Sequence, residues 1–487
     1  MSSQPDGPTG HMIGRKTEDA DMEEEALFRE KSGRRTVAEA LDDLQIGHFH
    51  VLHLLRMVLA WAIFSMTQES TPYMFQGLRL RFQADEDRIA TFAAAFPLGC
   101  AIGACVASPL LDHSGRRGTL LNILPCAAML SLAAGMAPNM LVLNILRMLQ
   151  AVAFSVAITG MSAWYIEFLP TSTRGMLMAA YSVGWPIGRA IVIWTAAWVK
   201  EDWTQFMALA AWGFVVFFTS MYYAHESPRF LAASGRAADA ARVLKEMYQS
   251  NGQGVWEHRI QIANSDGLDG RSRFRELILV KENRNLLIFA MSLFVMLAST
   301  TVLLDTWGPR LYRDLLAPGA SGLPHGILML FNLGDFAGIV LSILVIDHIG
   351  RCGSFVIGFI VQGCLLFLLT LLSSSGASSL HAFAVACGTL SSACRCFAWE
   401  SAQMWTLEVF PTQIRATAFS VAMTVMRLAS ILSLKVSAQY IGILDAANSL
   451  RILAALLLAS GLFSTLLLPK ETAKVPMTEA DADVKAF

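Results

Sequence analysis

Nine charged residues of this sequence lie inside long apolar stretches, where an ionised group is costly and therefore marks a candidate functional site. Three are acidic, namely Asp305, Asp335 and Glu400. Six are basic, namely Arg56, Arg147, Arg189, Arg395, Arg427 and Lys435. Because guanidinium groups bind planar oxyanions through paired hydrogen bonds, a cavity lined by this basic excess favours a carboxylate, sulfate or phosphate.

The candidate substrate-binding residues are therefore charged or aromatic side chains of these stretches: Arg427, Arg395, Arg189, Trp399, Asp335 and Glu400. Several alternatives stay open. Arg395 and Glu400 are five positions apart and can pair with each other or with neighbours, which would leave no net charge. Asp335, in NLGDFAG, can bind a proton or pair with an arginine. Trp399 can stack on an organic substrate or simply pack in the core.

The composition is typical of a membrane protein. Of the 487 residues, 54% are hydrophobic and only 15% are charged, whereas soluble proteins carry about 25% charged residues. This deficit excludes a disordered chain, a nucleic-acid-binding protein and a typical cytosolic enzyme. The net charge of -1 gives no field that would attract a polyanion. The eight cysteines lie almost all in apolar runs, which favours apolar packing over a metal or redox site.

Twelve stretches are long enough to cross a bilayer as helices, which takes about 20 apolar residues each. They cover roughly 48–68, 88–110, 118–136, 139–161, 176–199, 204–224, 286–305, 325–346, 353–373, 379–402, 415–440 and 449–468. Because helices satisfy their own backbone hydrogen bonds in lipid, we predict an all-α membrane protein with twelve transmembrane helices. Asp305 falls near the outer end of the seventh stretch, and Arg56 and Lys435 can reach the interface, so interfacial roles stay open for them.

Polar segments divide the sequence into five parts. We expect an N-terminal tail over 1–47, a six-helix half over 48–224, a central loop over 225–285, a second six-helix half over 286–468 and a C-terminal tail over 469–487. With the N-terminus inside, cytoplasmic segments hold 24 of the 37 basic residues and outside segments hold 7. This asymmetry predicts that both termini face the cytoplasm. Residues 36–44 have the pattern of a short amphipathic helix.

Two motifs recur in the two halves. DHSGRR at 112–117 returns as DHIGRC at 347–352, each directly after the second helix of its half. The spacing E-x-x-P-x-x-x-R occurs at 167–174 and again at 408–415. The two offsets, 235 and 241 residues, are nearly equal, which indicates two pseudo-symmetric halves. Duplicated halves are typical of secondary transporters.

These motifs resemble those of the major facilitator superfamily, and the resemblance covers about residues 36–475. The D-x-x-G-R-R turn is the signature of that superfamily. The sequence ESPRFL at 226–231 and the run ALDDLQIGHFH at 40–50 resemble the organic cation/anion transporters and the relatives of synaptic vesicle glycoprotein 2. The expected short outer loop over 69–87 resembles the compact members of this branch.

The resemblance implies that a set of charged and glycine residues gates alternating access. The set contains Asp112, Gly115, Arg116, Arg117, Asp347, Gly350, Arg351, Glu167, Arg174, Glu408, Arg415, Glu226 and Arg229. Gly115 allows a tight bend, and Asp112 can accept hydrogen bonds from the arginines or cap a helix. We expect each Glu and Arg set to form charge pairs with the turn of its own half. The alternative is that these charges only fix the topology.

The resemblance also bears on substrate and coupling. VMRLASILS around Arg427 resembles the eleventh helix of organic anion transporters, which carry arginine there. RMLQAVAFS around Arg147 resembles the arginine motif of the fourth helix, for which structural pairing and proton coupling stay open. Proton-linked relatives carry acids on helix one at the places of Phe64 and Thr67, and Glu69 is expected at the outer rim. We therefore expect a pH gradient to drive little accumulation.

We predict a transporter that moves a small organic solute, and specifically an organic anion. The alternatives are a proton-coupled sugar or metabolite symporter of the same fold and a non-transporting membrane receptor or scaffold. No metal-ligand cluster, nucleophile motif or phosphate loop is evident in the sequence, so we expect neither an enzyme nor a cofactor. The expected partners are the solute, the lipid of a plasma or vesicle membrane and a coupled ion, with no nucleic acid, and the expected state is a monomer.

Overall fold

The computed structural model describes residues 34–170, 173–199, 202–253, 259–260, 275, 277–320, 322–374, 378–410, 412–441 and 443–467. These residues form two compact units. The first unit comprises Met1–Leu52, Glu167–Arg174 and His225–Ser265, and the second comprises His53–Ile166, Gly175–Ala224 and Asp266–Phe487. Most of the expected N-terminal tail and the whole expected C-terminal tail, 469–487, lie outside the described residues.

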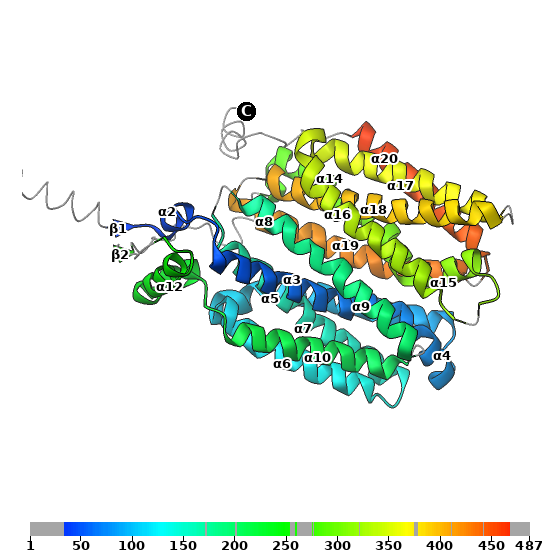
Figure 1. Ribbon diagram of the computed structural model, residues 1–487, viewed down its shortest axis with the longest axis horizontal. Helices are drawn as coiled ribbons and strands as arrows, with labels where there is room; N and C mark the ends of the chain where they lie inside the picture. Colours follow the sequence, from blue (N-terminus) through cyan, green and yellow to red (C-terminus); the bar gives the residue numbers. More distant parts are fainter. Residues whose placement is uncertain are drawn as a thin grey trace, which may run out of the picture. The chain divides into compact units, whose positions relative to one another are not determined.

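The described residues contain twelve helical runs that are long and apolar enough to cross a membrane, so the predicted fold is confirmed (Figure 1). The first six runs consist of α3 (His48–Glu69), η1 (Thr71–Met74), α4 (Phe75–Phe82), α5 (Glu86–Ser114), α6 (Arg116–Gly135), α7 (Met140–Ile166), α8 (Arg174–Ala180), η2 (Tyr181–Val183), α9 (Gly184–Val199) and α10 (Trp203–Tyr222). The last six consist of α14 (Lys281–Leu297), η3 (Ala298–Val302), α15 (Leu303–Leu316), α16 (His325–Ile349), α17 (Arg351–Ser374), α18 (Ser378–Val409), α19 (Thr412–Ile441) and α20 (Ala446–Leu466).

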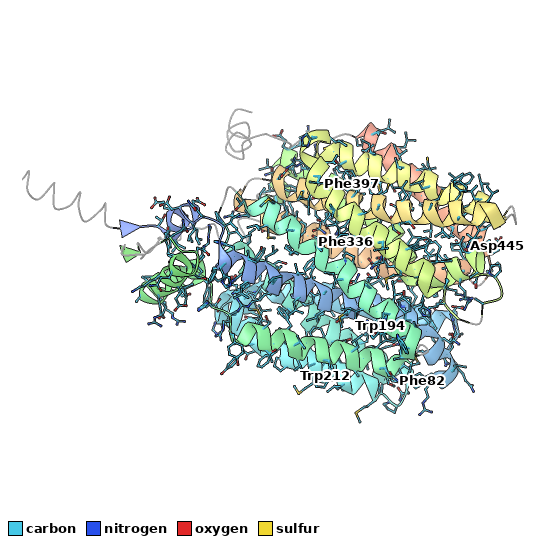
Figure 2. All side chains as sticks on the ribbon, in the orientation of Figure 1. Phe82, Trp194, Trp212, Phe336, Phe397 and Asp445 are labelled. Carbon is cyan, nitrogen blue, oxygen red and sulfur yellow. The ribbon has the colours of Figure 1, made fainter. Side chains whose placement is uncertain are left out.

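Large apolar side chains cover the outside of this helix bundle. Trp194, Trp212 and Phe336, labelled in Figure 2, are 62%, 68% and 42% exposed. Water would disfavour such a surface, whereas the hydrocarbon of a bilayer matches it. The protein is therefore an integral, multi-pass membrane protein.

Contacts between the two halves run mainly along two helix pairs, α5 with α19 and α9 with α16, and η1 and η2 also contact α15 and α16. We call the end of the bundle that carries α4, the start of α5 and the end of α15 the α4 end. The opposite end, where α5 and α16 finish at Gly115 and Gly350, is the turn end. Both glycines have positive φ, 79° and 91°, which a residue with a Cβ adopts poorly. The repeated motif thus makes the same turn in each half.

The first helix of each half is broken. In the first half, α3 ends at Glu69 and a 3₁₀ turn leads into α4, because Pro72 has no backbone N–H to continue the helix. The hydroxyl of Thr71 donates to the carbonyl of Gln68 at 2.8 Å and satisfies one of the freed groups. In the second half, the π-helical turn η3 interrupts the run, and Pro309 follows within α15. The prediction of an outer loop over 69–87 is wrong, because the chain remains helical to Phe82.

Glycines that stand four residues apart, Gly184 with Gly188 on α9 and Gly334 with Gly338 on α16, bring neighbouring helices into backbone contact. A Cβ on Gly188 would collide with the carbonyl oxygen of Ala62, and one on Gly338 with that of Ala393. These contacts join α9 to α3 and α16 to α18. A larger residue at either position would force these helices apart.

The first unit contains α2 (Val37–Asp42), α11 (Pro228–Ala233) and α12 (Ala237–Ser250), and the two-residue parallel strands β1 (Arg34–Arg35) and β2 (Arg259–Ile260). Thr36 caps α2 by accepting a hydrogen bond from the N–H of Glu39 at 3.3 Å, so the short helix predicted over 36–44 is present. The hydroxyl of Tyr248 donates to the carbonyl of Ala40 at 2.9 Å and ties α12 to α2. The expected central loop is therefore partly helical.

Candidate functional site

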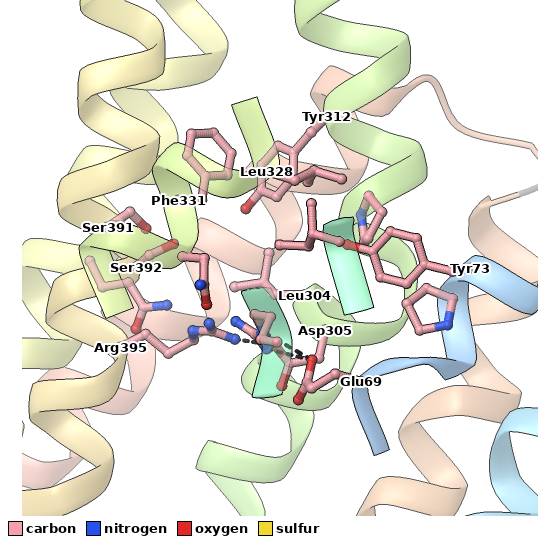
Figure 3. A pocket seen from close by; sticks show the side chains of 16 residues that line it. Glu69, Tyr73, Leu304, Asp305, Tyr312, Leu328, Phe331, Ser391, Ser392 and Arg395 are labelled. Carbon is pink, nitrogen blue, oxygen red and sulfur yellow. Dashed lines mark hydrogen bonds and ion pairs between the residues drawn. The ribbon is translucent and has the colours of Figure 1, made fainter. Parts of the chain in front are cut away.

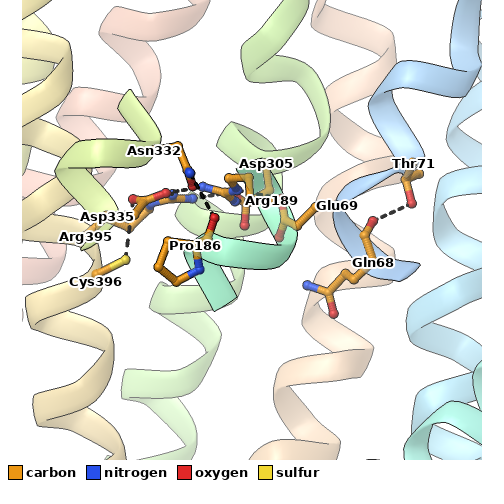
Figure 4. A network of polar contacts seen from close by, with 10 residues as sticks. All are labelled: Gln68, Glu69, Thr71, Pro186, Arg189, Asp305, Asn332, Asp335, Arg395 and Cys396. Carbon is orange, nitrogen blue, oxygen red and sulfur yellow. Dashed lines mark hydrogen bonds and ion pairs between the residues drawn. The ribbon is translucent and has the colours of Figure 1, made fainter. Parts of the chain in front are cut away.

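Five buried charged residues meet in the middle of the second unit. Arg189 on α9 and Arg395 on α18 lie against the carboxylates of Glu69 on α3, Asp305 on α15 and Asp335 on α16 (Figure 4). Their side chains are between 1% and 20% exposed. We call these five residues the central charge cluster. It contains three of the residues that the sequence singled out as substrate-binding.

Arg189 joins the two halves through this cluster. Its Nη2 lies 2.6 Å from Glu69 Oε2 in its own half and 2.6 Å from Asp305 Oδ1 in the other half. Its Nη1 lies 2.5 Å from Asp335 Oδ2. Arg395 completes the cluster, with Nη2 at 2.8 Å from both carboxylate oxygens of Asp335 and Nη1 in contact with Asp305.

The cluster holds one more carboxylate than guanidinium groups. With every group ionised, three negative and two positive charges leave a net charge of one negative unit. The oxygen Glu69 Oε1 is buried and accepts no hydrogen bond from the described residues. Oε2 of Glu69 already binds Arg189, so Oε1 is the oxygen of the cluster that is left without a hydrogen-bond donor among the described residues.

One sequence expectation is wrong here, and two alternatives that the sequence left open are resolved. Glu69 lies in the cluster with only 4% of its side chain exposed, so its expected place at the outer rim is wrong. This removes one part of the basis for expecting little coupling to a pH gradient, whereas Phe64 and Thr67 still supply no carboxylate. Asp305 is likewise in the cluster and not interfacial. Arg395 pairs with Asp305 and Asp335, whereas Glu400 lies beside Ser182.

A signal for Glu69 was present in the sequence. Each broken helix carries an acid followed closely by a proline, Glu69 with Pro72 and Asp305 with Pro309. The offsets between the copies, 236 and 237 residues, match those of the other repeated motifs. The repeat of acid and proline would have assigned Glu69 the same depth as Asp305.

Two pockets open beside the cluster. The first is lined by Glu69, Arg189, Asp305 and Arg395 and by aromatic and hydroxyl side chains that include Tyr312, Phe331 and Ser391 (Figure 3). The second, which we call the Arg427 pocket, is lined by Gln68, Glu69, Thr71, Pro72, Ala93, Phe96, Pro97, Val302, Asp305, Thr306, Arg427, Ser430 and Leu434. Glu69 and Asp305 line both pockets.

Arg427 differs from the two cluster arginines. It is half-buried on α19, and in the part of the chain that the structure describes its guanidinium has no ion-pair partner. The residues around it offer hydroxyl and amide groups, namely those of Gln68, Thr71, Thr306 and Ser430. Trp399 instead packs edge-on against Phe294, with ring centroids 6.3 Å apart, and neither it nor Glu400 lines these two pockets.

The repeated turns make polar contacts within their own halves. Arg116 lies 3.6 Å from Asp112, and Arg117 donates to the carbonyl of Tyr222 at 2.7 Å. In the second half, Arg351 binds both carboxylate oxygens of Glu408, at 2.9 and 3.0 Å, which confirms the pairing expected there. The side chains of Asp347 and Arg415 lie outside the described residues.

Comparison with known proteins assigns the family. The family described as "Sugar (and other) transporter" matches residues 57–484, which is most of the chain. The chain belongs to this family. It is thus a transporter of organic solutes in the major facilitator superfamily, as the repeated motifs predict.

Individual relatives have low sequence identity to this chain but match it over most of its length. The svop-1 protein of Caenorhabditis elegans, named as a transporter, is 23% identical over 86% of this chain and 81% of its own length. Organic cation/carnitine transporter 7 of Arabidopsis thaliana is 22% identical over 82% of this chain and 87% of its own. The inward-open structure of the xylose transporter XylE from E. coli covers 88% of this chain and 98% of its own, with a TM-score of 0.68 and 16% identity. That structure shares the fold.

The first unit of this transporter holds the other predicted gating residues. Glu167, Arg174 and Asp42 act electrostatically on Arg229. Burial lowers the pKa of the Arg229 guanidinium, and the positive charge of Arg174 lowers it further, while the two carboxylates oppose this shift. Glu226 accepts a hydrogen bond from the N–H of Ser227 at 3.0 Å, at the start of α11. The structure therefore brings Glu167 and Arg174 together around the guanidinium of Arg229.

Ion pairs also link the two halves of the transporter at the α4 end. Glu86 lies 2.7 Å from Arg310 of the second half. The neighbouring Asp87 lies 2.8 Å from Lys435, whose ammonium also contacts the hydroxyl of Thr91 at 2.5 Å. Lys435 thus has a carboxylate partner, a role that the sequence analysis did not foresee.

Proposed function

We propose that this transporter moves a small organic anion by alternating access. The two halves rock about the Arg427 pocket, so that it opens to one side of the membrane at a time. The turn end and both termini face the cytoplasm, which the 24 basic residues on that side against 7 on the other support. The protein acts as a monomer in a plasma or vesicle membrane.

The observation that carries this proposal is the guanidinium of Arg427, which has no ion-pair partner among the described residues and lines a pocket with hydroxyl and amide groups. A guanidinium in a low-dielectric site is stabilised by an anionic partner or by neutral hydrogen-bond acceptors, and Arg427 has neither among the described residues. Arg189 and Arg395 already have carboxylate partners, whereas Arg427 has none in the described part of the protein. An anionic substrate would supply that partner and would make a bidentate contact with it.

A second candidate is an organic cation. The excess carboxylate of the central charge cluster favours it, and the name of the Arabidopsis relative includes organic cations. A cation would bind at Glu69 or Asp305 and would leave Arg427 unpaired. The sign of the substrate charge therefore separates the two candidates.

The test is Arg427→Gln in proteoliposomes, assayed with benzoate and with its uncharged isostere benzamide. A charge-assisted contact contributes about 1.5–3 kcal/mol, so we expect benzoate affinity to fall about ten- to hundredfold while benzamide affinity changes little. Arg242→Gln is the matched control, because its side chain is 71% exposed in the first unit. Equal losses for both solutes would assign Arg427 a structural role, and a wild-type preference for benzylammonium would favour the cation.

A further inference from the structure

We infer that the preferred substrate is a zwitterion, whose anionic group binds Arg427 and whose cationic group binds Asp305 and Glu69 in the same pocket. This inference rests on the proposed function and narrows the substrate class. It follows from three features of the Arg427 pocket: an available carboxylate oxygen, the balance of charge, and the chemistry of the walls.

Asp305 and Glu69 each have one carboxylate oxygen that accepts no hydrogen bond from the described residues. Both arginines of the cluster bind Oδ1 of Asp305, while Oδ2 accepts no hydrogen bond from the described residues. The side chain of Asp305 is 20% exposed, against 4% for Glu69 and 1% for Asp335. Because Asp305 lines the Arg427 pocket, its second oxygen can accept from an ammonium group there. Glu69, with Oε1 unpartnered, reinforces the negative potential at the same wall.

The charges of the whole site sum to zero. With every group ionised, the central charge cluster carries one negative unit in excess and Arg427 carries one positive unit, and Glu69, Asp305 and Arg427 line the same pocket. An anion alone would neutralise Arg427 and leave the cluster uncompensated, and a cation alone would do the reverse. In a low-dielectric site each uncompensated charge is unfavourable. A zwitterion is the one simple class of solute that satisfies both poles together.

The rest of the pocket suits the body of such a solute. Phe96, Pro97, Val302 and Leu434 supply apolar walls between the charged groups. Binding pockets commonly combine an apolar lining with a few polar groups that fix orientation. The negative charge of Asp305 and Glu69 and the positive charge of Arg427 would therefore select both the charges and the orientation of the bound molecule.

The test uses three solutes of nearly equal shape in proteoliposomes: 4-(aminomethyl)benzoate as zwitterion, 4-methylbenzoate as anion and 4-methylbenzylammonium as cation. For the wild type we expect the zwitterion to be taken up at least tenfold better than either other solute. In Asp305→Asn and in Glu69→Gln, the ratio of zwitterion to anion uptake should fall toward one. A ratio measured within one variant does not depend on how much protein folds. Glu69→Gln also leaves the contacts of Asp305 with both arginines in place.

The matched control is Asp314→Asn, the same change on the same helix at a side chain that is 41% exposed, and it should keep the wild-type ratio. Equal uptake of anion and zwitterion by the wild type, unchanged by Asp305→Asn, would overturn the inference and leave the proposed function standing. Uptake of the anion together with one proton would also overturn it, because a proton on Glu69 would then balance the charge. Preference for the cation, or uptake of none of the three, would reject the proposed function itself.

Discussion

Arg147 is fully buried, and the groups that accept its hydrogen bonds among the described residues carry no charge. Its Nη1 donates to Gln150 Oε1 at 2.7 Å, and its Nη2 donates to the carbonyl of Thr67 at 2.8 Å and to the hydroxyl of Thr71 at 3.1 Å. The guanidinium also lies 4.6 Å from the ring centroid of Phe96. Near the end of α3 at Glu69, the carbonyl of Thr67 accepts from the hydroxyl of Ser70 at 3.1 Å, and Arg147 is a second donor to it. This geometry favours the structural alternative for Arg147.

We therefore predict that Arg147→Met destabilises the protein. The substitution leaves the amide oxygen of Gln150 without its donor, at a cost of about 1–3 kcal/mol for that buried group, while the carbonyl of Thr67 keeps the hydroxyl of Ser70 at 3.1 Å. The measurement is thermal unfolding of the purified protein in detergent. Arg242→Met serves as control, because the side chain of Arg242 is 71% exposed. An unchanged unfolding temperature for Arg147→Met would mean that Ser70 and water satisfy the groups that Arg147 binds.

At the scale of helices, the sequence predicted much of the fold because lipid imposes a simple rule. A span takes about 20 apolar residues, and the twelve stretches counted in this way correspond to the twelve observed runs. The breaks were not predictable by this rule. Hydropathy ends the first stretch at residue 68, since Glu69, Ser70 and Thr71 are polar, yet the run continues to Phe82. Helix continues there because the local hydroxyls of Ser70 and Thr71, together with Arg147 from α7, satisfy the broken backbone, and the part of Arg147 is a tertiary effect.

The same reasoning explains which site residues the sequence could identify. Arg189, Arg395 and Asp335 lie deep within apolar stretches, and the free-energy cost of placing a charge in lipid was enough to identify them. Their pairing was not, because it depends on which helix faces meet across the two halves. Glu69 was missed because it stands beside polar neighbours at a break, where hydropathy resembles that of a loop.

Helix packing leads to a further prediction, at Gly188. A Cβ at this position on α9 collides with the carbonyl oxygen of Ala62 on α3, so Gly188→Ala forces these two helices apart. Overpacking of this kind costs about 1–3 kcal/mol, and Arg189 next in the chain would shift away from Glu69. We expect a lower unfolding temperature together with weaker uptake. Gly326→Ala on α16 is the control, because a Cβ there would meet no described atom within 4 Å. Wild-type stability of Gly188→Ala would contradict the close packing.

At the scale of the whole bundle, alternating access requires the α4 end to separate. Two consecutive acids at the start of α5 now hold it, Glu86 through Arg310 and Asp87 through Lys435. Each pair joins the first half to a different helix of the second half, α15 and α19. These pairs must break whenever the α4 end opens, so their strength sets part of the balance between the two states.

Removing both pairs should therefore populate the state that is open at the α4 end. Partly exposed ion pairs contribute about 0.2–1 kcal/mol each, so Glu86→Gln with Asp87→Asn should raise that population about two- to thirtyfold. The readout is the distance between spin labels at Leu80 and Ile443, which are 78% and 83% exposed, in a chain whose eight cysteines are replaced. Glu86→Arg combined with Arg310→Glu restores one pair in reversed polarity and should bring the short distance back. If the distance distribution stays the same in the double variant, the ion pairs do not hold this end closed, and the contact between Phe75 and Trp307, at 5.4 Å between ring centroids, becomes the next closure to test.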